Sequence, residues 1–147
     1  MAKVIALCIS EKKGTQKHEV PEVEMRVDHG IVGDAHAGDW IRQVSLLGCE
    51  SVKKVQDKIE AFKLEHGAFA ENIVTEGICL YELPVGTRLQ VGEVLGEVTQ
   101  IGKTCHNDCV IKQTTGDCVM PREGIFIKIL APGMVRPGDE ISILLNG

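Results

Sequence analysis

The stretch that decides the fold is PVGTRLQVGEVLGEVTQIG, residues 84–102. Short runs of β-forming residues alternate in it with glycines, among them Gly86, Gly92 and Gly96. Glycine interrupts regular strands at turns and bulges, so the stretch predicts several short strands, with a bulge or tight bend at Gly96. Further strands are expected at EGIFIKIL (123–130) and ISILL (141–145). Between them, APGMVRPGDE carries two Pro–Gly signals and predicts a turn region.

The N-terminal half adds more strand patterns. Apolar and charged residues alternate through residues 22–27, and a period of two is typical of a half-buried strand. Residues 10–20 are polar and predict a loop, and GIVGDAHAGDW (30–40) contains too many glycines for a regular element. Other strands are expected at residues 3–9, 42–47 and 71–77.

A single segment has a convincing helical period. In CESVKKVQDKIEAF (49–62), Val52, Val55, Ile59 and Phe62 fall on one face, and the lysines fall on the rest. The strands do not alternate regularly with helices, which argues against a doubly wound α/β sheet. The sequence therefore predicts a mainly β fold, a closed or partly closed barrel with one or a few short helices.

The composition argues against several classes of function. The chain has 147 residues, which suits one domain over residues 1–147, with 44% hydrophobic and 25% charged residues. Aromatic residues make up 3% and the net charge is −5, so neither a stacking platform nor a basic stripe for nucleic acid is expected. The first apolar run is too short for a signal peptide or a membrane span, so a cytoplasmic location without membrane contact is expected.

Three of the six cysteines gather in GKTCHNDCVIKQTTGDC, residues 102–118. Cys105 and Cys109 are four residues apart, and His106 and Lys103 could favour a thiolate, so sulfur chemistry or soft-metal ligation is indicated. Two alternatives stay open. The thiols could be small buried hydrophobic groups, or Cys105, His106, Cys109 and Cys118 could bind a structural zinc ion. Cys8 and Cys79 lie singly in apolar runs, which is typical of packing cysteines; Cys49 approaches the same pattern.

Polar groups on a glycine-rich backbone form a second candidate site. Within residues 30–40, Gly33, Asp34 and His36 could present N–H groups and side chains to an anion such as phosphate. The structural alternative is an ordered turn whose aspartates accept backbone N–H bonds. Arg42, Lys103 and Arg122 flank the glycine-rich segments and could bind phosphate or carboxylate, although surface ion pairs would also explain them.

Three segments in order carry a resemblance to a known family. GIVGDAHAGDWIRQVSLL (30–47), GAFAENIVTEGICLYELPVGTRLQVGEVLGEVTQIGKTC (67–105) and MVRPGDEISIL (134–144) resemble a MOSC domain. This domain lies at the C-terminal end of molybdenum cofactor sulfurases and also occurs in small stand-alone proteins. The likeness extends over about residues 3–145 and implies a β-barrel-like fold.

The resemblance also implies a key cysteine after the strand that ends in VTQIGKTC, which corresponds to Cys105. Other members carry this thiol in an Arg-Cys context. Here Asp108 precedes Cys109, so Cys109 is the second candidate. In the family's reductases the cysteine is a molybdenum ligand, which makes Cys105 the candidate metal ligand too.

The function implied by this resemblance is binding of a molybdenum–pterin cofactor (molybdopterin) or a precursor. Cys105 would carry sulfur or ligate the metal, and the anionic cofactor would be held by Gly33, Asp34, His36, Arg42, Lys103 and Arg122. A sulfurase's pyridoxal phosphate domain does not fit in 147 residues, so sulfur transfer would need a partner such as a cysteine desulfurase, or a molybdoenzyme. The alternatives are a non-catalytic module that stores or hands over cofactor, and a zinc-stabilised structural domain.

Overall fold

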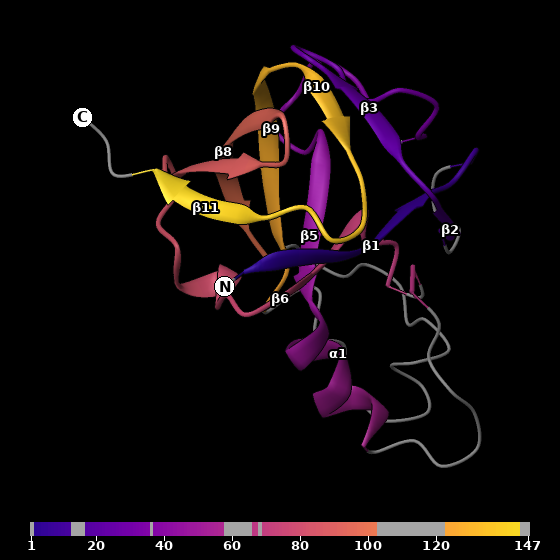
Figure 1. Cartoon of the computed structure of the whole chain (residues 1–147), viewed down its shortest axis with the longest axis vertical. Coiled ribbons are helices and arrows are strands. Elements are labelled where there is room, and N and C mark those ends of the chain that lie inside the picture. Colours follow the sequence, from indigo (N-terminus) through magenta and orange to yellow (C-terminus); the bar gives the residue numbers. More distant parts are fainter. Residues whose placement is uncertain are drawn as a thin grey trace.

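The computed structural model describes residues 2–12, 17–35, 37–57, 66–67, 69–102 and 123–144. Strands dominate this part of the chain, as the sequence predicts (Figure 1). The strands are β1 (Lys3–Ile9), β2 (His18–Val20), β3 (Val23–Arg26), β4 (Gly30–Ile31), β5 (Val44–Gly48), β6 (Ile73–Glu76), β7 (Arg88–Val91), β8 (Val94–Ile101), β9 (Ile125–Ala131), β10 (Gly133–Val135) and β11 (Ile141–Leu144). Helix α1 (Cys49–Gln56) and the 3₁₀ turn η1 (Leu80–Glu82) accompany them.

The described strands form two sheets. Eight strands pair in the order β11-β7-β8-β9-β5-β6-β1-β2, and three more pair in the order β10-β3-β4. An isolated antiparallel bridge from Lys3 to Glu140 links β1 to the residue before β11. The larger sheet nevertheless remains open in its strand pairing. The mainly β prediction is confirmed, and the closed barrel is not.

The core lies between the inner faces of the sheets. On β9, Ile125, Ile127 and Ile129 alternate inward and are almost fully buried, while Phe126 points to the other face. On β5, Val44 and Leu46 pair opposite β9 and join the same core. Every second side chain of these strands therefore points into the same core, as the alternating sequence pattern predicts.

Gly96 forms the bulge that the sequence predicts. The pairing of β8 with β9 shifts register between Leu95 and Gly96. A Cβ added at Gly96 would lie 2.7 Å from Cδ1 of Ile127, so this position has no room for a side chain. The glycine thus allows an inward-pointing isoleucine of the neighbouring strand to approach the backbone closely.

Three short strands were not predicted. Residues 18–20, 30–31 and 133–135 lie in segments for which the sequence indicated loops or turns. Each pairs with a longer strand: β2 with β1, and both β4 and β10 with β3. Hydrogen bonding to a partner strand overrides local turn propensity in such short pieces. The predicted helix begins as expected at Cys49, and residues 58–62 of that prediction lie outside the described residues.

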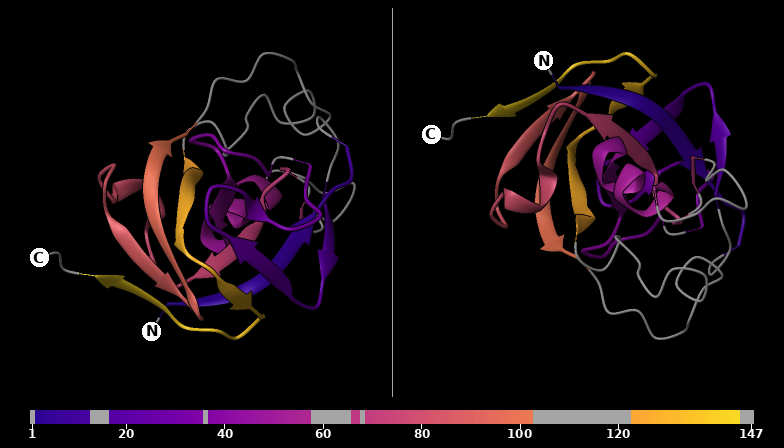
Figure 2. Two further views of the ribbon diagram at one scale, coloured as in Figure 1. Left: turned by 90° about the horizontal axis from the view of Figure 1, so that it is seen from above. Right: turned by 90° about the horizontal axis from the view of Figure 1, so that it is seen from below.

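Several strands begin or end at the edge of the larger sheet where helix α1 starts. Strands β5 and β6 are parallel, so both end there, with Gly48 paired to Thr75. Strand β8 ends and β9 begins at the same end, through the pair Ile101 and Ile125. Helix α1 continues from β5 beyond this end (Figures 1 and 2). Among the described helices, none has the length and apolar character needed to cross a bilayer.

Candidate functional site

The residues on either side of 103–122 meet at this end of the sheet. The backbone N–H of Gly102 donates to the carbonyl oxygen of Gly124 at 2.6 Å, which holds residues 102 and 123–124 together. Residues 103–122 lie between them in sequence and outside the described residues. The predicted site residues Cys105, Cys109, Lys103 and Arg122, the further zinc candidates His106 and Cys118, and His36 in the earlier loop all lie outside the described residues.

Arg42 is tied to the base of that segment. Its Nε donates to Oε1 of Gln100 at 3.1 Å, and its guanidinium carbon lies 5.6 Å from the ring centroid of Phe126. The amide of Gln100 in turn donates to the carbonyl oxygen of Gly102 at 2.8 Å. Within the described part of the chain no carboxylate forms an ion pair with this half-buried arginine. A cation placed in this way can bind an anion without first breaking a salt bridge.

Asp34 occupies a different, buried position. Its Oδ1 accepts a 2.7 Å hydrogen bond from the Lys17 ammonium and a 3.1 Å bond from the backbone N–H of Ser10. Both charged side chains of this ion pair are fully buried. The carboxylate is thus engaged in the manner of the structural alternative, and its contact with a cofactor stays a prediction. Neighbouring Gly33 has φ +91°, and a Cβ added to it would meet no atom within 4 Å.

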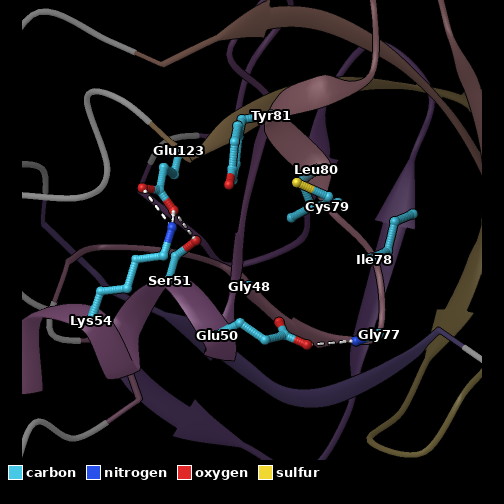
Figure 3. Close-up of a pocket in the computed structure, with 10 residues that line it drawn as sticks. All are labelled: Gly48, Glu50, Ser51, Lys54, Gly77, Ile78, Cys79, Leu80, Tyr81 and Glu123. Carbon is cyan, nitrogen blue, oxygen red and sulfur yellow. Dashed lines mark hydrogen bonds and ion pairs between the residues drawn. The ribbon is translucent and has the colours of Figure 1, made fainter. Parts of the chain in front are cut away.

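A pocket of about 280 Å³ opens where α1 leaves the sheet (Figure 3). Strand ends, the first turns of α1 and the η1 segment form its wall. It is lined by Gly48, Glu50, Ser51, Lys54, Gly77, Ile78, Cys79, Leu80, Tyr81 and Glu123. None of the predicted site residues that the structure describes is in this lining, so it does not bring Arg42, Gly33 or Asp34 into the pocket.

Glu123, the first described residue after 103–122, lines the pocket. Its Oε1 accepts hydrogen bonds from the Ser51 hydroxyl at 2.6 Å and from the Lys54 ammonium at 3.0 Å (Figure 3). The hydrogen bond that the Lys54 ammonium donates to Glu123 raises the pKa of Lys54, an exposed group. Helix α1 therefore holds the side chain of Glu123 in place. Lys54 belongs to the lysine face that sequence periodicity assigns to solvent, and its pairing with Glu123 has no local signal.

The second carboxylate of the pocket comes from the start of α1. Glu50 Oε2 accepts the backbone N–H of Gly77 at 2.8 Å, which joins the helix to the end of β6. A negative charge in the first turn of a helix also interacts favourably with the helix dipole. In the described part of the chain, the pocket lining thus contains two carboxylates and one ammonium group.

The Cys79 thiol faces the pocket, which corrects the interpretation of this residue as a packing cysteine. Cys79 is exposed, whereas Cys8 is buried. The turn η1 buries the neighbouring Leu80 and leaves Cys79 outside the core. Its side chain lies near the phenol of Tyr81 (Figure 3), and interaction with this thiol raises the pKa of Tyr81.

The other described thiols are less available for chemistry. Burial raises the pKa of Cys8 to about 12, with further contributions from the Glu71 and Glu19 carboxylates. Burial also raises the pKa of Cys49, aided by Glu50. Among the described residues no group of three or more histidine, cysteine or acidic side chains is placed to hold a metal ion.

Comparison with known proteins identifies the family. The family model for the MOSC domain matches residues 33–142. The chain belongs to the MOSC domain family. This match confirms the resemblance seen in the sequence, and the family is generally linked to molybdenum cofactor functions. A search of curated protein sequences gave no match.

Several crystal structures share the fold of this MOSC protein. The YuaD protein from Bacillus subtilis is 21% identical with a TM-score of 0.70, and the alignment covers 96% of this chain and 94% of that one. YiiM from Geobacillus stearothermophilus is 15% identical with a TM-score of 0.73, covering 100% and 77%. YiiM from Escherichia coli is 18% identical with a TM-score of 0.68, covering 99% and 69%. At these identities the likeness concerns the fold.

Proposed function

We propose that this MOSC protein binds a molybdenum–pterin cofactor or a precursor where Arg42 meets the base of the cysteine segment. Cys105 would serve there as a metal ligand or as a sulfur carrier. Membership of the family supports the general link to this cofactor. The particular site rests on the residues that surround Gly102.

The proposal rests mainly on the burial and the contacts of Arg42. It is half-buried, Gln100 and Phe126 fix its orientation, and it has no acidic partner within the described chain. Burying a cation without a counter-charge is costly, which favours a site that an anion completes. Guanidinium groups bind phosphate with two parallel hydrogen bonds. Arg42 therefore fits the phosphate-bearing, anionic cofactor.

The pocket beside α1 does not fit this cofactor. Glu50 and Glu123 outnumber Lys54 there, and Lys54 is already held by Glu123. Among the described lining residues, a phosphate would meet more carboxylate than ammonium groups. The contrast between the two places supports an anion site at Arg42, with Lys103 and Arg122 as candidate additional cations.

Each residue would have a simple role. Arg42 would bind and orient the anionic part of the ligand, and Gln100 would hold Arg42 in position. The cofactor, when bound, supplies a metal centre with affinity for soft thiolate ligands. Cys105, with Cys109 as the second candidate, would provide that thiolate. Where Cys105 carries sulfur instead, a cysteine desulfurase would supply the sulfur and a molybdoenzyme would be a possible recipient.

A binding titration with purified cofactor tests this proposal. Arg42→Ala should weaken the affinity by at least about tenfold, because it removes the charge-assisted hydrogen bonds of the guanidinium group. Arg88→Ala is the matched control, because Arg88 is exposed and pairs with Glu97 across β7 and β8. Equal affinities of the wild type, Arg42→Ala and Arg88→Ala would overturn the placement.

The role of the thiol needs a separate readout. Cys105→Ser should remove attached molybdenum or sulfur while pterin content, measured by fluorescence after oxidation, remains. Cys109→Ser provides the comparison between the two candidate thiols. Retention of molybdenum and sulfur in both variants would refute a thiol role in this segment.

A further inference from the structure

A hydroxyl, a carboxylate and an ammonium group converge on one wall of the pocket beside α1. The Ser51 hydroxyl donates to Glu123 Oε1 at 2.6 Å, and the Lys54 ammonium donates to both oxygens of the same carboxylate, at 3.0 and 3.2 Å. Figure 3 shows the three side chains directed toward one another, and all three line the pocket. The proposed cofactor site uses none of them.

The helix and the start of β9 hold these three groups in order. Ser51 and Lys54 are three residues apart on α1, so they lie on the same face of the helix. Glu123 reaches them from the residues just before β9. Ser51 and Glu123 are buried, with exposed fractions of 5% and 8%, and a hydrogen bond is stronger where water is excluded. The hydroxyl therefore has a fixed acceptor, and the acceptor has a fixed orientation.

This order is that of an activated nucleophile. A serine hydroxyl becomes nucleophilic when a base within about 2.6–3.2 Å takes its proton and a third group orients the base. Glu123 has the position of the base, and Lys54 has the position of the orienting group. A glutamate carboxylate is a weak base, with an ordinary pKa of about 4.3. The arrangement therefore suits acyl compounds with good leaving groups, such as aryl esters and thioesters.

The pocket also offers hydrogen-bond donors for the oxyanion that forms in acyl transfer. The first N–H groups of a helix have no intrahelical partner, and Ser51 lies in the first turn of α1. The positive end of the helix dipole lies at the same place. The phenol of Tyr81 lines the same space and remains a protonated donor near neutral pH, since interaction with the Cys79 thiol raises its pKa. Donors of both kinds stabilise a tetrahedral intermediate.

The size and charge of the pocket limit the acyl compound. Its volume of about 280 Å³ lies just below the ~300–1,000 Å³ typical of sites for drug-sized ligands. Among the described lining residues Glu50 and Glu123 outnumber Lys54, which disfavours an anionic substrate. Ile78 adds an apolar side chain to the lining. A short, uncharged acyl group fits these conditions.

We propose that Ser51 is a nucleophile for acyl transfer from small, uncharged aryl esters or thioesters bound in this pocket. The Ser51 oxygen forms a bond to the carbonyl carbon as its proton passes to Glu123. The C–O or C–S bond to the leaving group then breaks, and the leaving group takes that proton. Water next attacks the acylated serine, with its proton passing to Glu123. A carboxylic acid is released as Ser51 regains its proton, so the cycle needs neither an oxidant nor a reductant.

Diisopropyl fluorophosphate, a small uncharged reagent for serine nucleophiles, tests Ser51 directly in the folded full-length chain. Attack forms a P–O bond and releases fluoride, and peptide mass spectrometry locates the adduct. Ser142 is the internal reference: its hydroxyl also donates to a carboxylate, that of Glu140 at 3.3 Å, but on β11 and outside the pocket. Ser51 should react at least about a hundredfold faster than Ser142, the contribution of a positioned base, and urea should remove the difference.

Hydrolysis of para-nitrophenyl acetate measures turnover. Ser51→Ala should abolish the serine-dependent release of nitrophenol, and acylation of thiols, which both proteins share, cancels in the comparison. Glu123→Gln keeps an acceptor for the Ser51 hydroxyl but no longer takes its proton, so kcat should fall at least about a hundredfold. Glu140→Gln is the matched control, because Glu140 also accepts a serine hydroxyl but does not line the pocket.

Lys54 is a positioning residue in this scheme, since it acts through Glu123. Lys54→Met should lower kcat and leave KM nearly unchanged, because the base loses its orientation while the pocket keeps its shape. Lys54→Arg should recover part of kcat, since a guanidinium group can also bind a carboxylate through two hydrogen bonds. Lys53→Met, at the neighbouring position outside the pocket, should leave both constants unchanged.

Three results would overturn the proposal. One is reaction of Ser51 with the fluorophosphate no faster than that of Ser142. Another is equal nitrophenol release by the wild type and Ser51→Ala. The third is an equal kcat in Glu123→Gln and Glu140→Gln. The first comparison uses the unaltered chain, so it decides the matter even where a variant fails to fold.

Discussion

Arg42 and Gln100 are 58 residues apart in sequence, and the Arg42 Nε donates to Gln100 Oε1 at 3.1 Å. Through Gln100, which also donates to the Gly102 carbonyl oxygen, the arginine is coupled to the start of the cysteine segment. The arrangement joins the glycine-rich loop before β5 to the end of β8. Arg42 and Gly102, the last described residue before 103–122, are thereby held at one place in the fold.

A double-mutant cycle should measure this coupling. Arg42→Ala and Gln100→Ala should each lower the free energy of unfolding, and the double variant should lose less than the sum by about 1 kcal/mol, the net contribution of one hydrogen bond. Urea denaturation of the four proteins provides the values. Additive losses would show that the two side chains do not interact in solution.

The buried pair of Lys17 and Asp34 should be far more important for stability than surface pairs. Asp34→Ala leaves the buried Lys17 ammonium without this partner and should lower the free energy of unfolding by about 3–5 kcal/mol. Glu24→Ala removes an exposed carboxylate whose Oε2 lies 2.9 Å from Nε of Arg26. This variant should change the free energy of unfolding by less than about 1 kcal/mol. Similar losses in the two variants, measured by urea denaturation, would contradict this ranking.

The bulge at Gly96 provides a packing prediction. Gly96→Ala would place a methyl group against Cδ1 of Ile127 and should lower the free energy of unfolding by about 1–3 kcal/mol. Ile127→Val removes that Cδ1 atom, so the double variant should recover part of the loss. Thermal or urea denaturation measures both effects. Failure of the valine to compensate would show that the strain comes from the backbone.

Timed alkylation should rank the cysteines. At pH 8 the Cys8 thiolate fraction should be about 10⁻⁴, since its pKa is raised to about 12, and labelling should be very slow in the folded state. Cys79 should react much faster because it is exposed. Cys105 is expected to be the fastest, with Lys103 and His106 favouring its thiolate. Peptide mass spectrometry gives each rate, and rapid labelling of Cys8 would disprove its burial.

Glu71 should make stability fall as pH rises. Burial raises the pKa of its carboxyl group, although the backbone N–H groups of Gly67 and Phe69 donate to it and oppose the shift. The folded state then binds the proton more tightly than the unfolded state. The associated stability is fully present below about pH 4, the unfolded value, and is lost as pH rises through the folded pKa.

Glu71→Gln isolates that contribution. The free energy of unfolding of the wild type minus that of the variant should decrease between pH 4 and pH 7. Urea denaturation at several pH values measures this difference. A difference that stays constant or increases over that range would mean that the Glu71 pKa is not raised in the folded protein.

Local patterns in the sequence determined much of the secondary structure. The alternation around Val23 and Met25, the bulge at Gly96 and the start of the helix at Cys49 all depend on residues close in the chain. Side-chain period and the lack of a Cβ act at this short range, so the sequence alone predicts them. The ordered MOSC segments also identified the family, which the family model confirms.

Long-range contacts decided the rest. The sequence left Asp34 open between an anion-binding loop and an ordered turn, and it placed Cys79 among packing cysteines and Lys54 on a solvated face. The fold pairs Asp34 with Lys17, exposes Cys79 beside a pocket, and brings Glu123 to Ser51 across 72 residues. Periodicity shows which face of an element is apolar, but not which elements meet there. Pairing of strands and docking of α1 against the sheet decide that, and with it which charges are buried together.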